Sequence, residues 1–189
     1  MDIYFENKTY KRVDFTQTKI IKGEYDSCTF ENCNFENVHA SNIQFLECEF
    51  INCNFSNTVV HQTSFKQCVF IKCKMIGVKF NECDSFLLQF KFIDCQLSFS
   101  SFYQLKIPAT KFVNCNLQEV DFTEADINKT VFENSDLKAA IFRQTNLEAV
   151  NFSTAFNLTI DPENNIVKKA KFSKENILGL LYKYNIVIE

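Results

Sequence analysis

The chain has 189 residues, enough for one domain, and its formal net charge is −3. This mild negative charge argues against a general nucleic-acid-binding protein, which would usually be basic. Phe occurs 22 times and Trp never, which suits a narrow core of stacked rings. No apolar run reaches the ~18 residues of a membrane span, and the first ten residues lack the apolar segment of a secretory signal. With reduced thiols, these features predict a cytoplasmic protein.

An apolar residue recurs at every fifth position, here called the centre of a unit. The centres run from Phe5 to Phe90 in one register and from Phe92 to Phe152 in a second. The residue two before each centre is usually small or branched. Between Val13 and Phe152 these two positions number 57 and none is charged, whereas the chain average of 23% predicts about thirteen. Because buried charge is costly unless paired, we expect both positions to face inward.

Residues 1–25 match the repeat pattern less well. Lys8 occupies an inward slot, which indicates that it lies at the open end of the solenoid, where water can reach it. Residues 26–90 are the most regular. Within them the segment ENCNFEN returns twenty residues later as INCNFSN, so that Asn32 and Asn52 are expected to stack as an amide ladder. A uniform step of five fits neither an α-helix nor a sheet of hairpins. It indicates a short strand and a bend, wound into a coil.

All nine cysteines occupy the inward slot that Val, Thr and Ala fill in other units. Free Cys behaves as a small buried hydrophobe, so packing is the favoured interpretation. Zinc sites use closer Cys spacings, whereas a disulfide between stacked neighbours fits the distance between strands. Disulfide and metal binding therefore remain as alternatives, and we predict no metal and no cofactor.

This five-residue unit resembles that of the pentapeptide-repeat family, over roughly residues 13–155. The resemblance implies an all-β fold, a right-handed quadrilateral parallel β-helix with four units in each coil. For residues 1–172 it implies about eight to nine coils. Residues 83–92 hold a two-residue slip of register, where the coil must bulge, either as a recognition feature or as the scar of an insertion. Residues 156–168 are expected to form an irregular corner.

Residues 173–189 are predicted to cap the solenoid. Ser173 is a plausible N-cap for an α-helix over 173–184, and residues 185–189 are expected to form a short strand. The segment carries more apolar surface than a cap needs, so we predict a two-fold homodimer, with a monomeric cap as the alternative. The predicted interface residues are Ile177, Leu178, Leu180, Leu181, Tyr184, Ile186, Val187 and Ile188.

The sequence shows no pairing of a nucleophile with a base and no glycine-rich phosphate loop. His39 and His61 are isolated at outward positions, and a filled solenoid leaves no cleft. We therefore predict that the protein is not an enzyme, that no residue is catalytic, and that it has no small-molecule substrate, no direct nucleic-acid ligand and no membrane partner. What remains is a stiff rod with a patterned surface.

The C-terminal sequence is similar to that of the Qnr and MfpA type of quinolone-resistance pentapeptide proteins. The matching residues are Ile160, Asp161, Pro162, Ala170 and Phe172, followed by the predicted helix and strand. The resemblance implies a rod-shaped DNA mimic that binds the type II topoisomerases DNA gyrase or topoisomerase IV and protects them from fluoroquinolones. The repeats lack the obvious projecting loops of several Qnr members, which puts the strength of protection in question.

An acidic segment provides the candidate partner-binding residues, which are Glu119, Asp121, Glu124, Asp126, Glu133 and Asp136. With one lysine, Lys129, among these six acids, the segment has a net charge of −5 over little more than one coil. Duplex DNA of the same axial length would carry about three negative charges. We hypothesise that this band faces the DNA-binding surface of a type II topoisomerase. The alternative for these acids is a solvent-exposed face that only keeps the rod soluble.

The alternative function of the protein is that of a non-catalytic structural or adaptor solenoid, with a partner bound near Ile51 and Ile71 or at residues 83–92.

Overall fold

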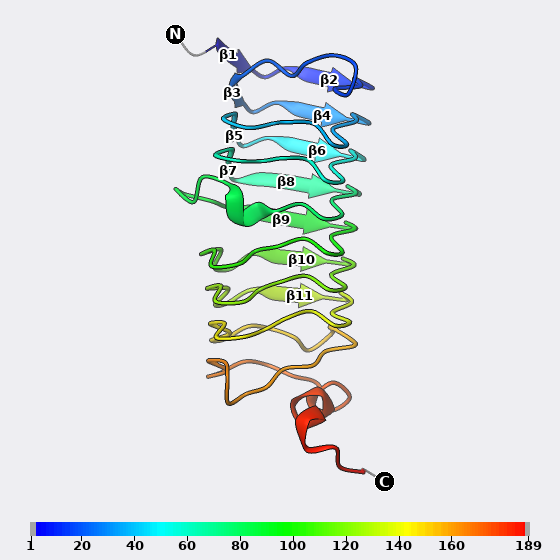
Figure 1. Cartoon of the computed structure of the whole chain (residues 1–189), viewed down its shortest axis with the longest axis vertical. Coiled ribbons are helices and arrows are strands. Elements are labelled where there is room, and N and C mark those ends of the chain that lie inside the picture. The colour runs from blue at the N-terminus through cyan, green and yellow to red at the C-terminus, as the bar shows by residue number, and fades with distance from the viewer. Residues whose placement is uncertain (1–2, 188–189) are drawn as a thin grey trace.

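The computed structural model of the protein describes residues 3–187. It is a rod of short parallel strands stacked one above another, with the two ends of the described chain at opposite ends of the rod (Figure 1). One sheet contains four strands, β1 (Ile3–Glu6), β3 (Gly23–Asp26), β5 (Gln44–Leu46) and β7 (Ser64–Lys66). The other contains seven, β2 (Thr9–Lys11), β4 (Thr29–Glu31), β6 (Glu49–Ile51), β8 (Cys68–Ile71), β9 (Phe90–Ile93), β10 (Lys111–Val113) and β11 (Val131–Glu133).

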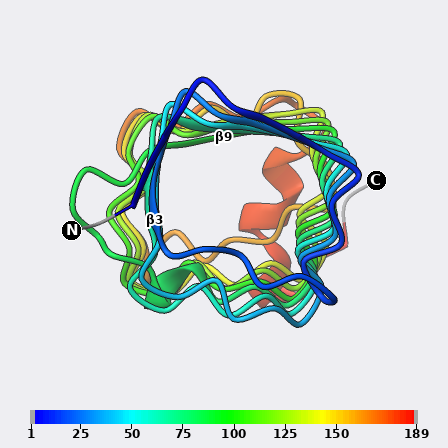
Figure 2. The same cartoon turned by 90° about the horizontal axis from the view of Figure 1, so that it is seen from above.

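Each strand pairs in register with the strand one coil further along the chain, so that Tyr10 lies beside Phe30. The two other sides of the coils carry single-residue bridges in place of strands, for example Asn34 to Asn54. Seen along the axis, the coils superpose into a four-sided outline around a common core (Figure 2). The predicted all-β, quadrilateral parallel β-helix is therefore confirmed.

The strands of the longer sheet mark seven successive coils, slightly fewer than the eight to nine expected. The difference lies near the C-terminal end. There, single bridges from Val131 to Asn151 and from Asn151 to Lys171 continue the same side without strands. Within residues 3–187, no helix has the length and apolar character needed to cross a bilayer.

The bend between units has a left-handed backbone. The residue two after a centre has φ +56° at Asn32 and +57° at Asn37, and this repeats in nearly every unit. Asn accepts this conformation better than most residues because its short polar side chain bonds locally. Asn52 Nδ2 also donates to Asn32 Oδ1 at 2.6 Å, which confirms the expected amide ladder. The recurring asparagines thus serve the bends of the fold.

Phenylalanine rings of successive coils stack along the rod. On the seven-stranded side, the ring centroids of Phe50 and Phe70 are 4.8 Å apart and those of Phe112 and Phe132 are 5.1 Å apart. Rings from adjoining sides meet edge to face, as Phe102 does with Phe112. These are favourable geometries for aromatic pairs. The rings are fully buried, which confirms the inward assignment of these centres.

All nine cysteines are buried and free, so their predicted inward packing is confirmed. Seven of the thiols, all but those of Cys83 and Cys115, bond to carbonyls of the preceding coil, as Cys48 Sγ does to Tyr25 O at 3.2 Å. The Thr145 hydroxyl fills the equivalent slot and donates to Phe122 O at 2.8 Å. Burial raises the pKa of Cys48 to about 12. A thiol that stays protonated at neutral pH is a poor nucleophile.

The register slip forms a projecting loop. Between η1 (Phe80–Glu82) and β9, Cys83 and Leu88 are buried, whereas Ser85, which the five-residue spacing places at a centre, is exposed. The chain bulges outward between these two buried residues, at 84–87 (Figures 1 and 2). The expectation that the repeats carry no projecting loop is therefore wrong, because the two extra residues extend outward and leave the core register intact.

The predicted α-helix over 173–184 is also wrong, because this segment forms two 3-10 turns, η2 (Ile177–Leu180) and η3 (Tyr182–Tyr184). The N–H groups of Gly179 and Leu181 bond to carbonyls three residues back, each at 3.0 Å. Asn185, with φ +46°, ends the second turn. Residues 185–187 form no strand, and 188–189 lie outside the described residues, so the predicted strand is absent from its described part.

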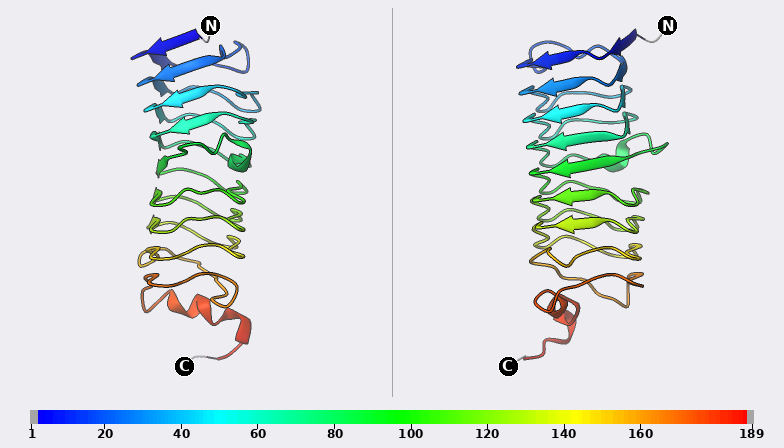
Figure 3. Two further views of the ribbon diagram at one scale, coloured as in Figure 1. Left: turned by 90° about the vertical axis from the view of Figure 1, so that its left-hand side faces the viewer. Right: turned by 180° about the vertical axis from the view of Figure 1, so that it is seen from behind.

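Contacts with the last coil explain the tight turns. Asn176 Nδ2 donates to Phe152 O at 2.6 Å and to Ala155 O at 3.1 Å. Ser173 Oγ accepts a hydrogen bond from Asn176 N at 3.2 Å. The predicted N-cap role of Ser173 is nevertheless wrong, because η2 begins at Ile177 and its N-cap is Asn176. A Cβ on Gly179 would lie 1.9 Å from Leu158 O, so the backbone of η2 lies directly against the coil. The segment therefore covers the end of the rod (Figure 3).

Candidate functional site

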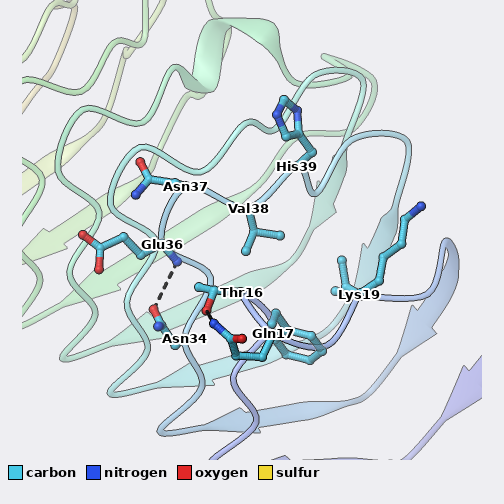
Figure 4. A pocket seen from close by; sticks show the side chains of 10 residues that line it. Thr16, Gln17, Lys19, Asn34, Glu36, Asn37, Val38 and His39 are labelled. Carbon is cyan, nitrogen blue, oxygen red and sulfur yellow. Dashed lines mark hydrogen bonds between the residues drawn. The ribbon is translucent and has the colours of Figure 1, made fainter.

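A surface groove of about 630 Å³ lies between the bends at residues 15–20 and 34–39 (Figure 4). Glu36 N donates to Asn34 Oδ1 at 3.1 Å and Gln17 Nε2 to Thr16 Oγ1 at 3.2 Å, and Asn54 of the next coil donates to Glu36 Oε2 at 3.0 Å. Among the described residues, no hydrogen bond joins His39 to another side chain of the groove. The groove therefore presents no assembled acid–base pair for catalysis. That the protein is not an enzyme stays a prediction.

Three of the six predicted partner-binding acids stabilise bends. Each accepts a hydrogen bond from the backbone N–H two residues later, at 2.9 Å for Asp121, 3.3 Å for Asp126 and 3.0 Å for Asp136. Asn116 and Asn146 make the same contact at 3.0 and 3.1 Å. Because an amide oxygen serves equally well in this turn, the turn uses the acceptor and leaves the charge free for another use.

Asp136 is held in its ionised form. Burial alone would raise the pKa of its carboxyl group, but hydrogen bonds from Asn157 and Gln118, both at 2.7 Å, outweigh burial and lower the pKa. Such bonds favour the charged form of a carboxyl group.

The three glutamates are exposed and less constrained. Glu119 and Glu124 occupy bends with φ +56° and +57°, and Gln104 Nε2 donates to Glu124 Oε2 at 2.8 Å. Glu133 ends β11 on the seven-stranded side. Their side chains extend into solvent, where a partner can reach them.

The structure does not gather the six acids on one face. Asp121, Asp126, Glu133 and Asp136 belong to ladders on four successive sides of the rod. Their neighbours one coil away carry no negative charge, for Asp121 lies between Ser101 and Ile141. The run from Glu119 to Asp126, which we call the acidic quartet (Glu119, Asp121, Glu124 and Asp126), occupies two adjoining sides at one level. The band is thus a ring around the rod.

The C-terminal turns expose most of the apolar residues predicted for a dimer interface. Leu180 packs partly against the core, and Ile188 lies outside the described residues. The exposed ones are Ile177, Leu178, Leu181, Tyr184, Ile186 and Val187. Tyr182, which the sequence analysis omitted, is 75% exposed and lines a groove of about 500 Å³ with Leu178 and Ile186. Tyr182 lies four residues after Leu178 and four before Ile186, and this spacing could have identified it as part of the apolar patch. An exposed patch of this kind is typical of an interaction surface.

Ion pairs fasten this segment to the corner at residues 161–163. Lys183 Nζ lies 2.8 Å from Asp161 Oδ1 and 2.5 Å from Glu163 Oε2. The Lys183 ammonium lowers the pKa of both carboxyl groups. Tyr184 donates its hydroxyl to Glu163 Oε1 at 3.2 Å. We call Asp161, Glu163 and Lys183 the C-terminal clasp.

The projecting loop is a surface feature whose direction the sequence analysis missed. Phe86 and Leu87 are each 65% exposed, and Lys66 Nζ lies 5.5 Å from the Phe86 ring centroid, a distance suited to a cation–π contact. A groove of about 470 Å³ runs beside the loop, lined by Leu46, Leu87 and Pro108 among others. The slip of register located the loop, whereas its direction depends on which residues stay buried.

The pentapeptide repeat region, as a family model, matches residues 23–91 and 85–154, well over half of the chain. The chain belongs to the pentapeptide-repeat family. The coils, inward centres and bends described above are those of its repeats. No curated protein matches the sequence.

Solved pentapeptide-repeat structures share the architecture. A trypsin-treated variant of QnrB1, a plasmid-mediated fluoroquinolone resistance protein, is 12% identical, with a TM-score of 0.64 over 99% of this chain and 100% of that one. A second treated variant is 13% identical, with a TM-score of 0.55 over 99% and 92%. HetL, involved in heterocyst differentiation regulation in the cyanobacterium Nostoc, is 13% identical, with a TM-score of 0.45 over 90% and 85%. At identities this low, the two QnrB1 matches, whose TM-scores exceed 0.5, show a shared fold alone.

Proposed function

We propose that the protein is a non-catalytic binding rod that acts on a type II topoisomerase, DNA gyrase or topoisomerase IV, and protects it from fluoroquinolones. The observation that carries this proposal is the fold shared with QnrB1 over the full length of both chains. The Qnr-like residues around Asp161 and Pro162, which form the corner fastened by the clasp, support it further.

The acidic quartet is the proposed contact for the basic DNA-binding surface of the enzyme. Duplex DNA carries one charge per ~1.7 Å of its axis, so a coil rise of ~4.8 Å corresponds to about three charges. The quartet supplies four carboxylates at one level of the rod, on two adjoining sides. Because its members have no acidic neighbours in the ladders above and below, the mimicry is confined to this level.

We further propose that two rods join through the C-terminal turns. The exposed side chains of Leu178, Leu181 and Ile186 would bury one another across a two-fold axis. The quartet lies in the coils toward this end, so a dimer would place two quartets on either side of its axis.

A supercoiling assay with purified gyrase and ciprofloxacin tests the function. The protein is expected to restore supercoiling that the drug blocks, or to inhibit supercoiling without the drug. If the protein neither rescues nor inhibits the enzyme, with gyrase and with topoisomerase IV, the proposal is ruled out.

Charge neutralisation tests the quartet without disturbing the bends. The variant Glu119→Gln, Asp121→Asn, Glu124→Gln, Asp126→Asn keeps every turn acceptor, as Asn116 and Asn146 show. We expect it to fold normally and to lose at least about tenfold in apparent affinity for the enzyme. The matched control, Glu133→Gln with Asp136→Asn on the remaining sides, should bind nearly as well as the native protein. Equal loss in both variants would contradict the role given to the quartet.

Sedimentation equilibrium tests the dimer. The native protein should sediment as a dimer, and Leu181→Glu with Ile186→Glu should give a monomer of unchanged fold. A native monomer at micromolar concentration would exclude this interface.

A further inference from the structure

The seven-stranded side of the rod carries an outward aliphatic ladder. Ile51, Ile71, Ile93 and Val113 follow one another in register on strands β6, β8, β9 and β10. Each is only half-buried, because the inward face of its strand holds the core ring. Parallel sheets are usually covered on both faces, and no described segment of this chain covers the outer face of these strands (Figure 1).

Two lysines interrupt the neighbouring outward column on the same strands. Lys91 on β9 pairs in register with Lys111 on β10, between Val69 on β8 and Val131 on β11. Like charges directly opposite each other destabilise a sheet. Among residues 3–187, neither lysine has an acidic oxygen within ion-pair distance. The fold alone therefore gains nothing from these two charges.

The projecting loop borders this face where the strands begin. Gln67 and Gln89, which line the groove beside Leu87, directly precede β8 and β9. The groove is thus continuous with the outer face of the sheet. The loop projects at this edge (Figures 1 and 3), and its Phe86 and Leu87 are exposed. We call the outer face of β8, β9 and β10, together with the loop, the lysine–aliphatic face.

We propose that the lysine–aliphatic face is a docking site for an extended segment of a partner protein that carries acidic side chains beside a bulky apolar one. The acids would pair with Lys91 and Lys111, the backbone would lie over the aliphatic ladder, and the apolar side chain would enter the groove beside Leu87. This site is separate from the acidic quartet and does not rest on the proposed action on a topoisomerase.

Charge and shape favour a protein segment over other polyanions. A nucleic acid is held by a broad basic surface, whereas this face and its groove offer three lysines, Lys66, Lys91 and Lys111, on a rod of net charge −3. Recognition of anionic lipid takes a cluster of about four to eight basic residues, and Asp84 within the loop opposes it. The aliphatic ladder would serve neither phosphate surface. A few cations beside an apolar groove are suited to an acidic–apolar peptide.

The test is an array of extended fluorescent peptides added to the full-length protein, read by anisotropy. Peptides alternating Glu and Val with one Phe should bind, and those with Lys in place of Glu should not. Lys91→Glu with Lys111→Glu should weaken binding about tenfold or more, as should Phe86→Ser with Leu87→Ser. The control Lys169→Glu with Lys174→Glu changes the same charge at the C-terminal end and should bind like the native protein. Duplex DNA and phosphatidylserine vesicles are the competing ligands.

Thermal unfolding distinguishes a binding role of Lys91 from a purely structural one, because the two predict opposite changes in melting temperature when this lysine is replaced. Lys91→Glu removes a repulsion and allows an ion pair with Lys111, so we expect a higher melting temperature together with weaker peptide binding. A lower melting temperature would show that the lysine serves the fold and would overturn the proposal. Three other results would also overturn the proposal. These are a failure of the acidic–apolar peptides to bind, an equal loss of binding in the Lys169→Glu, Lys174→Glu control, and tighter binding to DNA or vesicles than to the peptides.

Discussion

Single residues in this rod meet two geometric demands, an inward slot of fixed size and, at many bends, a hydrogen-bond acceptor. Cys, Thr and Ser share the slot two before a centre because each can donate to a carbonyl of the preceding coil. Asp and Asn share the bend because both present an oxygen to the same N–H. The first demand was visible in the sequence as the absence of charge. The second was not, because an outward Asp looks the same whether it serves a turn or a partner.

A matched pair of threonines measures the value of the inward donor. Thr63 and Thr130 are both fully buried in equivalent slots. The Thr63 hydroxyl donates to Ala40 O, which accepts no other hydrogen bond among the described residues, whereas the Thr130 hydroxyl has no partner there. Thr63→Val should therefore cost about 1–3 kcal/mol in urea unfolding. Thr130→Val should be neutral or stabilising. Equal effects would mean that the slot selects shape alone.

At the scale of elements, a local sequence pattern predicts an element correctly only where the element's form depends on local geometry. The coils follow from a repeated unit, and so the sequence predicted them well. The C-terminal segment shows helical apolar spacing, yet its form depends on the last coil, because Asn176 bonds to Phe152 and Ala155 and Gly179 touches Leu158. The acidic band as a partner site stays a prediction. A count of charge per segment does not show on which side each acid lies, because every five residues turn the chain to the next side.

Gly179→Ala should detach the C-terminal turns. The added Cβ would lie 1.9 Å from Leu158 O, a backbone atom that cannot move without shifting the coil. We expect rapid proteolysis within residues 174–187 and loss of the dimer, while the remaining coils keep their circular dichroism. Lys174→Ala, an exposed change in the same segment, is the control. Retention of protease resistance in Gly179→Ala would contradict the close packing.

The clasp makes the docking of these turns dependent on pH. The Lys183 ammonium lowers the pKa values of Asp161 and Glu163 below their ordinary values of 3.8 and 4.5. Carboxyl groups with lowered pKa values stabilise the folded form above their unfolded pKa and lose that contribution as the pH falls through the folded one. Hydrogen exchange at Gly179 and Leu181 should therefore accelerate, relative to the intrinsic rate, below about pH 4. Lys183→Met should remove this step, and persistence of the step would assign it to other groups.

The whole molecule behaves as a one-dimensional stack, in which each coil contacts only its neighbours. Its core is filled along its length by rings such as Phe50, Phe70, Phe112 and Phe132. Function is therefore confined to the outer surface and the ends. Three outward features occupy different parts of the surface. The lysine–aliphatic face and the acidic quartet lie on different sides of the rod, and the C-terminal turns lie at its end. A rod of this kind can hold two partners at once without coupling them through a cavity.

Cavity creation tests that independence between coils. Phe112 is fully buried between Phe92 and Phe132, at centroid distances of 5.1 Å on both sides. Phe112→Ala should cost about 3–5 kcal/mol and accelerate hydrogen exchange mainly in β9, β10 and β11. Strands β2 and β4 should keep their protection, because nearest-neighbour contacts carry the stability. Phe5→Ala, at the half-buried N-terminal end, should cost much less. Uniform loss of protection from β2 to β11 would show that the rod unfolds as one cooperative unit.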